Sequence, residues 1–297
     1  MDRFEAMQLF VSVAEQQSFA AAARSHSLSA ARVTRAIAAL EQRVGARQLH
    51  RTTRAVRLTD AGASYLGHCK RILGEVEAAE SLVASSHRAL SGSLTITAPL
   101  LFGRLHVAPV LTEFLKRHRH VSMRVMFADH LLDFFEQNID VAIRIAHLPD
   151  SSLRAIRVGT VRRVVCASPT YLRANGLPRH PRELAEHETI GFSGMAEPHA
   201  WSFTVDGRHE RFPVRPRLVV NNADLAIAAA RSGQGLTKVL SYQVADEVDH
   251  KRLRIVLAEY ELEPVPVHVV HVEGKNSSTR VRAFVELAVE QLRLALA

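Results

Sequence analysis

The sequence predicts an α/β protein with a small helical domain, a long connecting helix and a larger two-lobed α/β domain. Three observations support this fold class. Helix-spaced apolar residues run from Phe4 to Val44, and a short alternating basic segment follows them, which together predict a winged helix-turn-helix. Residues 61–90 contain no strong helix breaker. After Ser91-Gly92-Ser93, apolar runs alternate with helical patterns, which is typical of a sheet with crossover helices.

Composition places the chain among ordinary folded proteins. Its 297 residues suffice for two domains with separate cores, and 47% hydrophobic with 23% charged residues argue against disorder. Cys69 and Cys166 stand far apart and form neither a Cys-x-x-Cys pair nor a disulfide framework, so we expect each to be a small buried residue. Asp2 and Glu5 stand where a signal peptide carries positive charges, and no run approaches ~20 apolar residues. We therefore expect a cytoplasmic protein without a membrane partner.

Positive charge is concentrated near the N-terminus. The whole chain carries a formal net charge of +8, whereas the segment from Ala21 to Asp60 alone holds eight arginines, no lysine and two acidic residues, a formal charge of +6. Planar guanidinium groups suit bidentate contacts with phosphate and guanine. The distribution favours a nucleic-acid partner, with a solvated basic surface as the alternative.

The first three helices follow from spacing and capping residues. Apolar residues from Phe4 to Val13 predict a first helix, Ser18 is a suitable N-cap for an alanine-rich helix over Phe19–His26, and residues 27–29 form a turn. A third helix over Ala30–Arg43 buries a stripe that consists of Val33, Ile37, Leu40 and Val44.

The opposite face of the third helix is suited to DNA. Short and polar side chains gather near its N-terminal end, where recognition helices contact base edges. An amphipathic surface helix is the alternative, but the preceding helix and tight turn favour recognition. We therefore predict DNA contacts by Ser29, Ala31, Arg32, Thr34 and Arg35.

A wing is predicted beyond Gly45, which ends the third helix. Residues Leu49–Thr59 alternate as a short hairpin with exposed basic and hydroxyl groups. Arg51, Thr52, Thr53 and Arg54 are predicted to contact phosphates or enter the minor groove, whereas an ordinary basic hairpin is the alternative. Residues 1–60 thus form the predicted DNA-binding domain.

Two segments, FVSVAEQQSFAAAA and LSAARVTRAIAALEQRVGARQLHRTTRAVRLTDAG, resemble the DNA-binding domain of LysR-type transcriptional regulators across nearly its full length. The resemblance implies that Thr34 and Arg35 reach base edges of double-stranded DNA and that Arg51 and Arg54 contact its backbone. Members of this family often have proline and serine where this chain has Ala30 and Ala31.

Residues 61–90 are predicted to form a linker helix with one apolar stripe, composed of Leu66, Cys69, Ile72, Leu73, Val76, Ala79, Leu82 and Val83. A long amphipathic helix needs a partner for such a stripe. The family resemblance implies the same helix of a second subunit, giving a homodimer, with homotetramers common; packing on its own domain is the alternative. A two-fold dimer matches an inverted-repeat operator.

Residues 91–297 are predicted to form two lobes, lobe I about 91–160 with 267–297 and lobe II about 161–266. Predicted strands are Leu94–Thr97, Val121–Phe127, Val141–Ile145 and Leu218–Val220, a hairpin surrounds Asp206-Gly207, and predicted helices are Arg104–Arg117, His130–Gln137, Ala223–Arg231 and Ser277–Leu296. These alternations indicate a parallel sheet, and two such lobes leave a cleft where small ligands commonly bind.

This part resembles the family's effector-binding domain, which is like the periplasmic binding proteins. The resemblance implies an unidentified small organic effector bound by Pro99, Leu100, Leu101, Phe102, Arg144, Phe192, Ser193, Trp201, Asn222 and Thr237. The Arg144 guanidinium suits a carboxylate, although a structural ion pair explains it equally well. Many relatives have a hydroxyl residue near Pro99 and Leu100, and its absence here allows a more apolar effector.

Enzymatic chemistry finds little support. Gly191-Phe192-Ser193-Gly194-Met195 departs from G-x-S-x-G at its last position, Lys238 ends an incomplete G-x-G-x-x-G, and His118-x-His120 has no matched ligand set. We predict no catalytic residue, metal site or cofactor. The expected function is effector-controlled regulation of transcription at the nucleoid, with RNA polymerase as a further partner of an activator. A stand-alone solute-binding or enzymatic α/β domain is the alternative, but it gives residues 1–60 no use.

Overall fold

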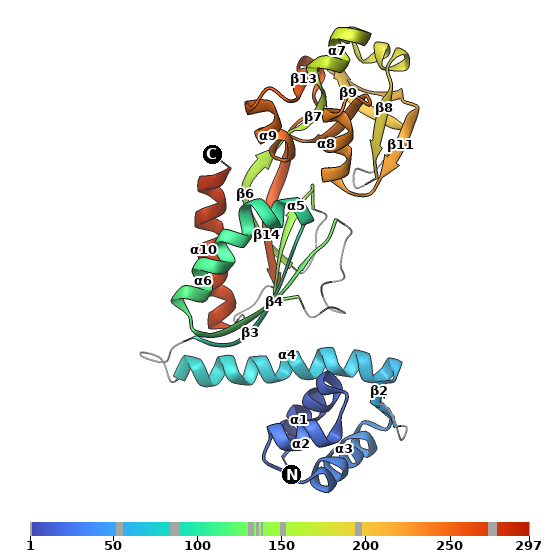
Figure 1. The fold of residues 1–297 in the computed structure, drawn as a ribbon. Helices are drawn as coiled ribbons and strands as arrows, with labels where there is room; N and C mark the ends of the chain where they lie inside the picture. The colour runs from blue at the N-terminus through green and yellow to red at the C-terminus, as the bar shows by residue number, and fades with distance from the viewer. Residues whose placement is uncertain are drawn as a thin grey trace. The chain divides into compact units, whose positions relative to one another are not determined.

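The computed structural model describes residues 2–51, 56–83, 90–129, 134, 137, 139–148, 153–193, 198–272 and 278–296 (Figure 1). The chain divides into two compact units. The first comprises Met1–Gly92, Leu132–Asp140 and Glu273–Arg282, and the second comprises Ser93–Leu131, Val141–Val272 and Ala283–Ala297. Within the described ranges, no helix combines the length and apolar character needed to cross a membrane.

The first unit contains the expected helical domain and wing, followed by a long helix. Its elements are α1 (Arg3–Gln16), α2 (Phe19–Ser25), α3 (Ala30–Val44), β1 (Leu49–Arg51), β2 (Val56–Leu58) and α4 (Asp60–Val83). Side chains of Asp2, Ser18 and Ser29 accept backbone hydrogen bonds at the starts of the first three helices, and Gly45 ends α3 with φ +75°. Leu9, Phe10, Ile37 and Leu40 form a core that is at most 1% exposed.

The apolar stripe of α4 is used within its own domain at its N-terminal half. Leu66, Ile72 and Leu73 pack against the helical core, and Cys69 is fully buried in it. The Tyr65 ring lies 5.5 Å from that of Phe10. This N-terminal half of α4 therefore packs on its own domain, whereas Ala79, Leu82 and Val83 lie in the part of α4 whose side chains are not described.

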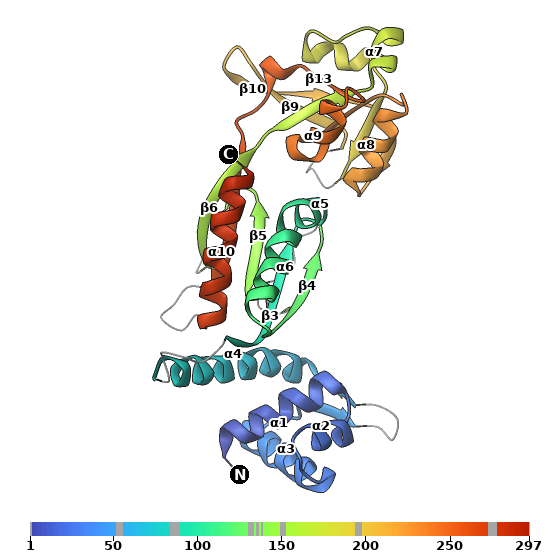
Figure 2. The same ribbon diagram turned by 60° about the vertical axis from the view of Figure 1, so that its left-hand side comes forward.

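Lobe I of the second unit is built on a five-stranded mixed sheet in the order β4-β3-β5-β14-β6. Its strands are β3 (Ser91–Ala98), β4 (His120–Phe127), β5 (Val141–Ile145), β6 (Leu153–Val161) and β14 (Val265–Val272). The prediction of a parallel sheet was incomplete, because β14 runs antiparallel to both β5 and β6. Helices α6 (Ala108–Arg117) and α10 (Thr279–Ala295) lie beside this sheet (Figure 2).

One expected helix of lobe I begins before its predicted range, and another lies mostly outside the described residues. The helix expected over Arg104–Arg117 begins earlier, as α5 (Leu100–Phe102) and a π-helical turn η1 (Gly103–Val107) that continue into α6. Most of the helix expected over His130–Gln137 lies outside the described residues. Within that range the structure describes Phe134 and Gln137, and both are in turns.

Lobe II has a second five-stranded sheet, in the order β11-β8-β12-β7-β13. The strands are β7 (Arg163–Ala167), β8 (Thr189–Phe192), β11 (Pro216–Val220), β12 (Leu236–Leu240) and β13 (Arg254–Val256). One core cluster contains α8 (Ala223–Arg231) and part of α9 (Ser241–Asp249). The other contains α7 (Pro169–Asn175), η2 (Pro181–Glu186), η3 (Ala258–Tyr260) and the hairpin of β9 (Ala200–Val205) and β10 (Arg208–Pro213).

Candidate nucleic-acid interface and lobe junction

Away from the core of its domain, helix α3 presents a face that consists of arginines and small side chains. Val33, Ala36, Ile37 and Leu40 are buried, whereas Ala31, Arg32, Arg35 and Ala38 are exposed and Thr34 is half-buried. Val44 was expected in the buried stripe but is 41% exposed, because it occupies the last turn before Gly45 and projects beyond the core. The face therefore offers a guanidinium pair between small side chains that leave room for a close approach.

The two exposed arginines differ in their surroundings. The Arg32 guanidinium lies 3.5 Å from the Glu5 carboxylate of α1, with both side chains well exposed. Across the described part of the chain no ion pair or hydrogen bond involves the Arg35 guanidinium. Ser29 is already engaged, since its hydroxyl accepts a hydrogen bond from the backbone N–H of Arg32 at 3.3 Å and caps the helix. Of the two exposed arginines on this face of α3, Arg35 is therefore the one whose guanidinium has no hydrogen bond or ion pair with a described residue.

The wing is fixed to α3 by a carboxylate that the sequence did not single out. Oε1 of Glu41 accepts hydrogen bonds from the backbone N–H groups of Gln48 at 2.9 Å and Leu49 at 3.1 Å. Strands β1 and β2 pair antiparallel, with His50 opposite Arg57, both exposed. The backbone of Arg51 ends β1, while Thr52, Thr53 and Arg54 lie outside the described residues. Glu41 thus aligns the wing with the recognition face.

A second fixing point lies at the start of α4. The Thr59 hydroxyl donates to the carbonyl of Arg47 at 2.7 Å and accepts from the backbone N–H of Gly62 at 2.9 Å. The backbone N–H of Thr59 in turn donates to the carbonyl of Gln48 at 3.1 Å. The Thr-Asp-Ala-Gly segment therefore ties the wing to the long helix.

In the second unit, α5 brings the two lobes into contact. Leu101 is 4% exposed and belongs to the lobe II core cluster that contains Phe192, Val220 and Ala223. The ring of Phe102 lies 4.8 Å from His106 and 5.2 Å from Tyr242 of α9. The structure thus places Leu101 and Phe192 in one core cluster, and His106 and Tyr242, which the sequence did not indicate, lie beside Phe102.

Two polar side chains at this junction, His106 and Tyr242, differ in their hydrogen bonding. Nε2 of His106 is buried without a hydrogen-bond partner among the described residues, and burial lowers the pKa of this imidazole. Burial raises the pKa of the Tyr242 phenol, whose oxygen accepts a bond from Gln243 at 3.4 Å. The neighbouring π-helical turn is a feature that often marks functional sites.

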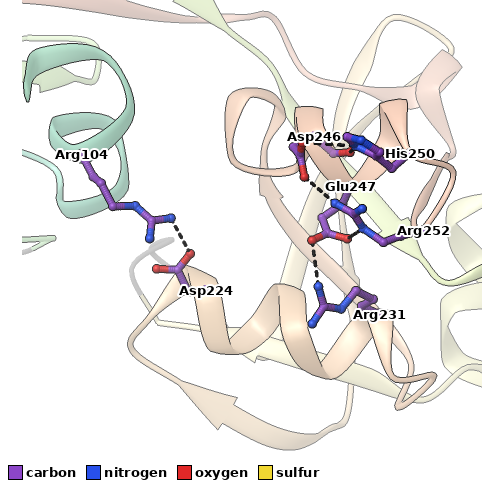
Figure 3. Close-up of polar contacts among 7 residues, drawn as sticks. All are labelled: Arg104, Asp224, Arg231, Asp246, Glu247, His250 and Arg252. Carbon is purple, nitrogen blue, oxygen red and sulfur yellow. Dashed lines mark hydrogen bonds and ion pairs between the residues drawn. The ribbon is translucent and has the colours of Figure 1, made fainter. Parts of the chain in front are cut away.

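An exposed ion pair also links the lobes. Figure 3 shows Arg104, from η1, directed at Asp224 in the first turn of α8, with 3.4 Å between Nη2 and Oδ1. A separate network within lobe II joins Arg231 and Arg252 to Glu247, at 3.1 and 2.6 Å, while Arg252 and His250 also contact Asp246. The largely buried Glu247 carboxylate therefore holds the ends of α8 and α9 together.

Three further residues predicted to bind the effector, Ser193, Asn222 and Thr237, make hydrogen bonds within lobe II. Ser193 and Asn222 follow the neighbouring parallel strands β8 and β11, and the backbone N–H of Ser193 donates to Val220. The Asn222 side chain caps α8 by accepting from Leu225 N–H at 3.0 Å. Buried Thr237 donates to the Ile190 carbonyl at 3.2 Å. These contacts give each of the three a structural role at the ends or interior of lobe II strands.

Four predicted residues complete the set. Leu100 is 39% exposed, and its backbone N–H donates to Asp129 at 3.0 Å, directly after the half-buried Pro99. Arg144 is in β5 opposite His268, and burial lowers the pKa of its guanidinium. The structure separates Trp201 from the residues around Leu101, because this 4% exposed indole packs with Phe203 and Phe212 in the other core cluster of lobe II.

Two family models match the chain and together cover most of it. The model of bacterial regulatory helix-turn-helix proteins of the lysR family matches residues 4–63, and that of the LysR substrate binding domain matches residues 87–293. An HTH-type transcriptional regulator of Xanthomonas campestris pv. campestris is 37% identical over 288 residues, covering 96% of this chain and 84% of that protein.

Solved structures agree in fold. CrgA, a LysR-type transcriptional regulator from Neisseria meningitidis, is 29% identical with a TM-score of 0.62, and the match covers 98% of this chain and 99% of that one. Full-length LysG from Corynebacterium glutamicum, solved with bound effector Arg, has a TM-score of 0.63 at 20% identity, covering 99% and 100% of the two chains. At that identity the likeness to LysG shows the fold alone.

Proposed function

Because the chain belongs to the LysR family of transcriptional regulators, we propose that α3 reads base edges in the major groove while the wing contacts the phosphate backbone. The observation that carries this proposal is the outward face of α3, on which exposed Arg35 stands beside Ala31 and Ala38 with its guanidinium unengaged by any described residue. An arginine so placed binds guanine O6 and N7 bidentately. Arg32, which is tied to Glu5, is assigned to positioning or phosphate contact.

Replacing Arg35 with alanine tests base reading. We expect Arg35→Ala to weaken binding to the cognate operator by about 1–3 kcal/mol, roughly 5- to 150-fold, with little change on a scrambled duplex. The operator is first obtained by footprinting genomic DNA bound by the purified full chain. Affinities for both duplexes are then measured by fluorescence anisotropy at one fixed salt concentration.

A matched control is available on the same helix. Arg43→Ala removes the same charge from the exposed last turn of α3, about 12 Å along the axis from Arg35. It should leave the ratio of the two affinities unchanged. An equal loss on operator and scrambled DNA in the Arg35 variant would assign that residue to phosphate and remove it from base reading.

The wing arginine is predicted to behave differently. Arg54 lies outside the described residues, and the family resemblance assigns it to the DNA backbone. We expect Arg54→Ala to weaken operator and scrambled DNA to a similar extent and to reduce the slope of log affinity against log salt by about 1. Titrations at four salt concentrations measure that slope; a loss confined to one sequence contradicts the assignment.

The effector-binding domain is proposed to control these contacts. A small organic effector bound near Leu101, Phe102 and the junction between the lobes would change the closure of the lobes or the packing of subunits. The buried Nε2 of His106 is the polar atom best placed to hydrogen-bond such a molecule, and the surrounding aromatic rings favour one with an apolar body. Arg144 remains proposed for a carboxylate.

Partners and location follow from the same proposal. A homodimer through α4, or a homotetramer, would bind an inverted-repeat operator, and an activator would also contact RNA polymerase. Such a protein works on the chromosome in the bacterial cytoplasm. Its relatives are regulators, and we propose that this chain likewise catalyses no reaction and needs no cofactor beyond its effector.

A further inference from the structure

The wing has two faces, and only one of them packs on its domain. Strands β1 and β2 are three residues each and pair with Leu49 opposite Leu58. Leu49 is 3% exposed, and Leu58 packs against the same helical core. Because successive side chains of a strand point to opposite faces, the central residue of each strand, His50 or Arg57, stands on the outer face of the wing.

His50 and Arg57 form an unfavourable pair as long as no anion lies between them. They are directly opposite in the antiparallel pairing, where the Cβ atoms of facing residues are about 4.5–5.5 Å apart. Both residues are exposed, and neither side chain has a hydrogen bond or ion pair with a described residue. Like charges in this position destabilise a strand pair, so a protonated imidazole that faces a guanidinium needs a counter-charge.

The described acidic groups around the wing do not supply that counter-charge. Glu41 of α3 is bound by backbone N–H groups at the start of β1, and Glu5 and Glu15 of α1 are paired with basic side chains elsewhere. Asp60 begins α4 and forms no ion pair with either wing residue in the described structure. The described basic groups of the two helices that contact β2 are Arg3 of α1 and His68 and Lys70 of α4. The anion therefore has to come from outside these residues.

We propose that His50 and Arg57 together bind one phosphate of the DNA backbone and that this contact takes up a proton at His50. A phosphate oxygen between the two strands accepts from the guanidinium and from the protonated imidazole, so two groups that repel each other both attract one anion. The inference rests on the proposed function, DNA binding by α3 and the wing, and adds a dependence of that binding on pH.

The direction of this dependence follows from the charge of the imidazole. Histidine changes its charge between about pH 5 and pH 8, and only the protonated form attracts the phosphate. The DNA-bound protein thus holds more protons than the free protein, and its affinity for DNA falls as the pH rises. Arg54 of the wing stays charged throughout this range, so its contribution does not depend on pH.

The wing is also held in place before DNA binds. Glu41 fixes the start of β1, and the Thr59 hydroxyl ties the end of β2 to the carbonyl of Arg47. The backbone that carries the pair therefore need not be ordered by the phosphate, and little of the binding free energy is lost to ordering.

Replacing His50 with glutamine tests the contact, because the slope of log affinity against log salt counts phosphate contacts. At pH 5.5 we expect His50→Gln to reduce this slope by about 1 and to weaken binding about tenfold, on operator and scrambled DNA alike. At pH 8 its slope and affinity should equal those of the wild type. Fluorescence anisotropy with the full chain, at four salt concentrations and both pH values, measures these quantities.

Two variants of the pair and one control separate charge from structure. Arg57→Ala should reduce the slope by about 1 at both pH values, because a guanidinium stays protonated. His50→Lys keeps its charge and should bind at pH 8 as tightly as at pH 5.5. The control His26→Gln removes an exposed imidazole of the same domain, at the end of α2, and should change neither the slope nor the pH dependence. Circular dichroism checks that every variant is folded.

Three results would overturn the inference. An unchanged slope for His50→Gln at pH 5.5 removes the phosphate contact, an equal loss at both pH values removes the role of the proton, and a loss confined to the operator contradicts a backbone contact. In each case the Arg35→Ala variant still reports separately on base reading. Failure of the wing pair is therefore distinguishable from failure of the proposed function.

Discussion

Gly62→Ala is expected to destabilise the N-terminal domain by about 3 kcal/mol and to weaken operator binding by disturbing the wing. A Cβ at this position would lie 2.0 Å from the carbonyl oxygen of Gln48 and 2.9 Å from its carbonyl carbon. These are backbone atoms of a residue that is 1% exposed, so they cannot rotate away as a flexible side chain would. Forced overpacking of this kind costs about 1–3 kcal/mol, and the backbone contact places Gly62 at the upper end.

The Gln48 backbone is also held from both sides. Its N–H donates to Glu41 and its carbonyl accepts from Thr59, so a shift that relieves the clash breaks the bonds that align the wing with α3. Loss of stability and loss of DNA affinity are therefore expected together in this variant.

Gly74→Ala is the matched control, because it makes the same change in the same helix, where the new Cβ has no described atom within 4 Å apart from the adjacent residues and the helix's own nearby backbone. It should stabilise the domain by about 0.4–1 kcal/mol. Urea unfolding of the full chain followed by circular dichroism measures the difference, while fluorescence of the single tryptophan, Trp201, reports on lobe II separately. If the Gly62 variant unfolds at the wild-type urea concentration, the proposed constraint does not exist.

The N-terminal domain could be predicted closely because its determinants are local. Ser18, Ser29 and Gly45 cap helices within three or four residues of their own positions, and the burial of Val33, Ile37 and Leu40 follows from helical spacing. The constraint on Gly62 could not be predicted from its neighbours. It comes from a carbonyl 14 residues earlier in the chain, whose approach depends on the path of the wing.

The larger domain was predicted less completely, for physical reasons. Asp206-Gly207 gave the hairpin turn, where both residues have positive φ of 48° and 75°, as a two-residue turn requires. Strand β6 was not predicted, and the sheet that was expected to be parallel is mixed, because β14 pairs antiparallel with β5 and β6, strands more than 100 residues away. Nothing near either strand in the sequence specifies that partner or its direction.

The residues of the lobe junction show the same division. Leu101 and Phe192 belong to one core cluster although 91 positions separate them, and only the family resemblance had grouped them. Trp201 could have been placed from the sequence, since Trp201, Phe203 and Val205 alternate with partly exposed residues and must share one buried face of β9. His106 and Tyr242 gave no sequence signal, because their role depends on contact between distant helices.

A second large effect is expected from Lys238, a lysine buried in β12. Its residue is 7% exposed, and its ammonium donates to the carbonyl of Ser202 at 2.5 Å and lies 4.4 Å from the centre of the Phe203 ring. Burial and the nearby charge of Arg163 lower the pKa of Lys238 to about 8 from 10.5, against an opposing contribution from Glu261. The hairpin thus covers an amine that is costly to keep protonated.

The direction of the pH effect follows from proton counts. Between pH 8 and 10.5 the unfolded chain keeps the Lys238 proton while the folded chain releases it, so folding stability rises with pH through this window. Below pH 8 both states are protonated and the full penalty applies, about 3 kcal/mol for a shift of this size. Buried Cys166 opposes the trend, because a thiol whose pKa is raised to about 12 from 9 lowers stability as pH rises above 9.

Comparison with Lys238→Met separates the lysine from these other groups. Methionine has an apolar stem of similar length and does not titrate. The contributions of cysteine and tyrosine titration to the unfolding free energy are present in both proteins and cancel in the difference. We expect the unfolding free energy of the wild type minus that of the variant, measured by urea titration with Trp201 fluorescence, to rise by about 2.5 kcal/mol from pH 7 to pH 10. The lost hydrogen bond to Ser202 shifts the whole difference curve without changing its slope, because neither the Ser202 carbonyl nor the Phe203 ring titrates. A flat curve would mean that Lys238 keeps its ordinary proton affinity in the folded chain, and therefore that water reaches its ammonium beneath the β9–β10 hairpin.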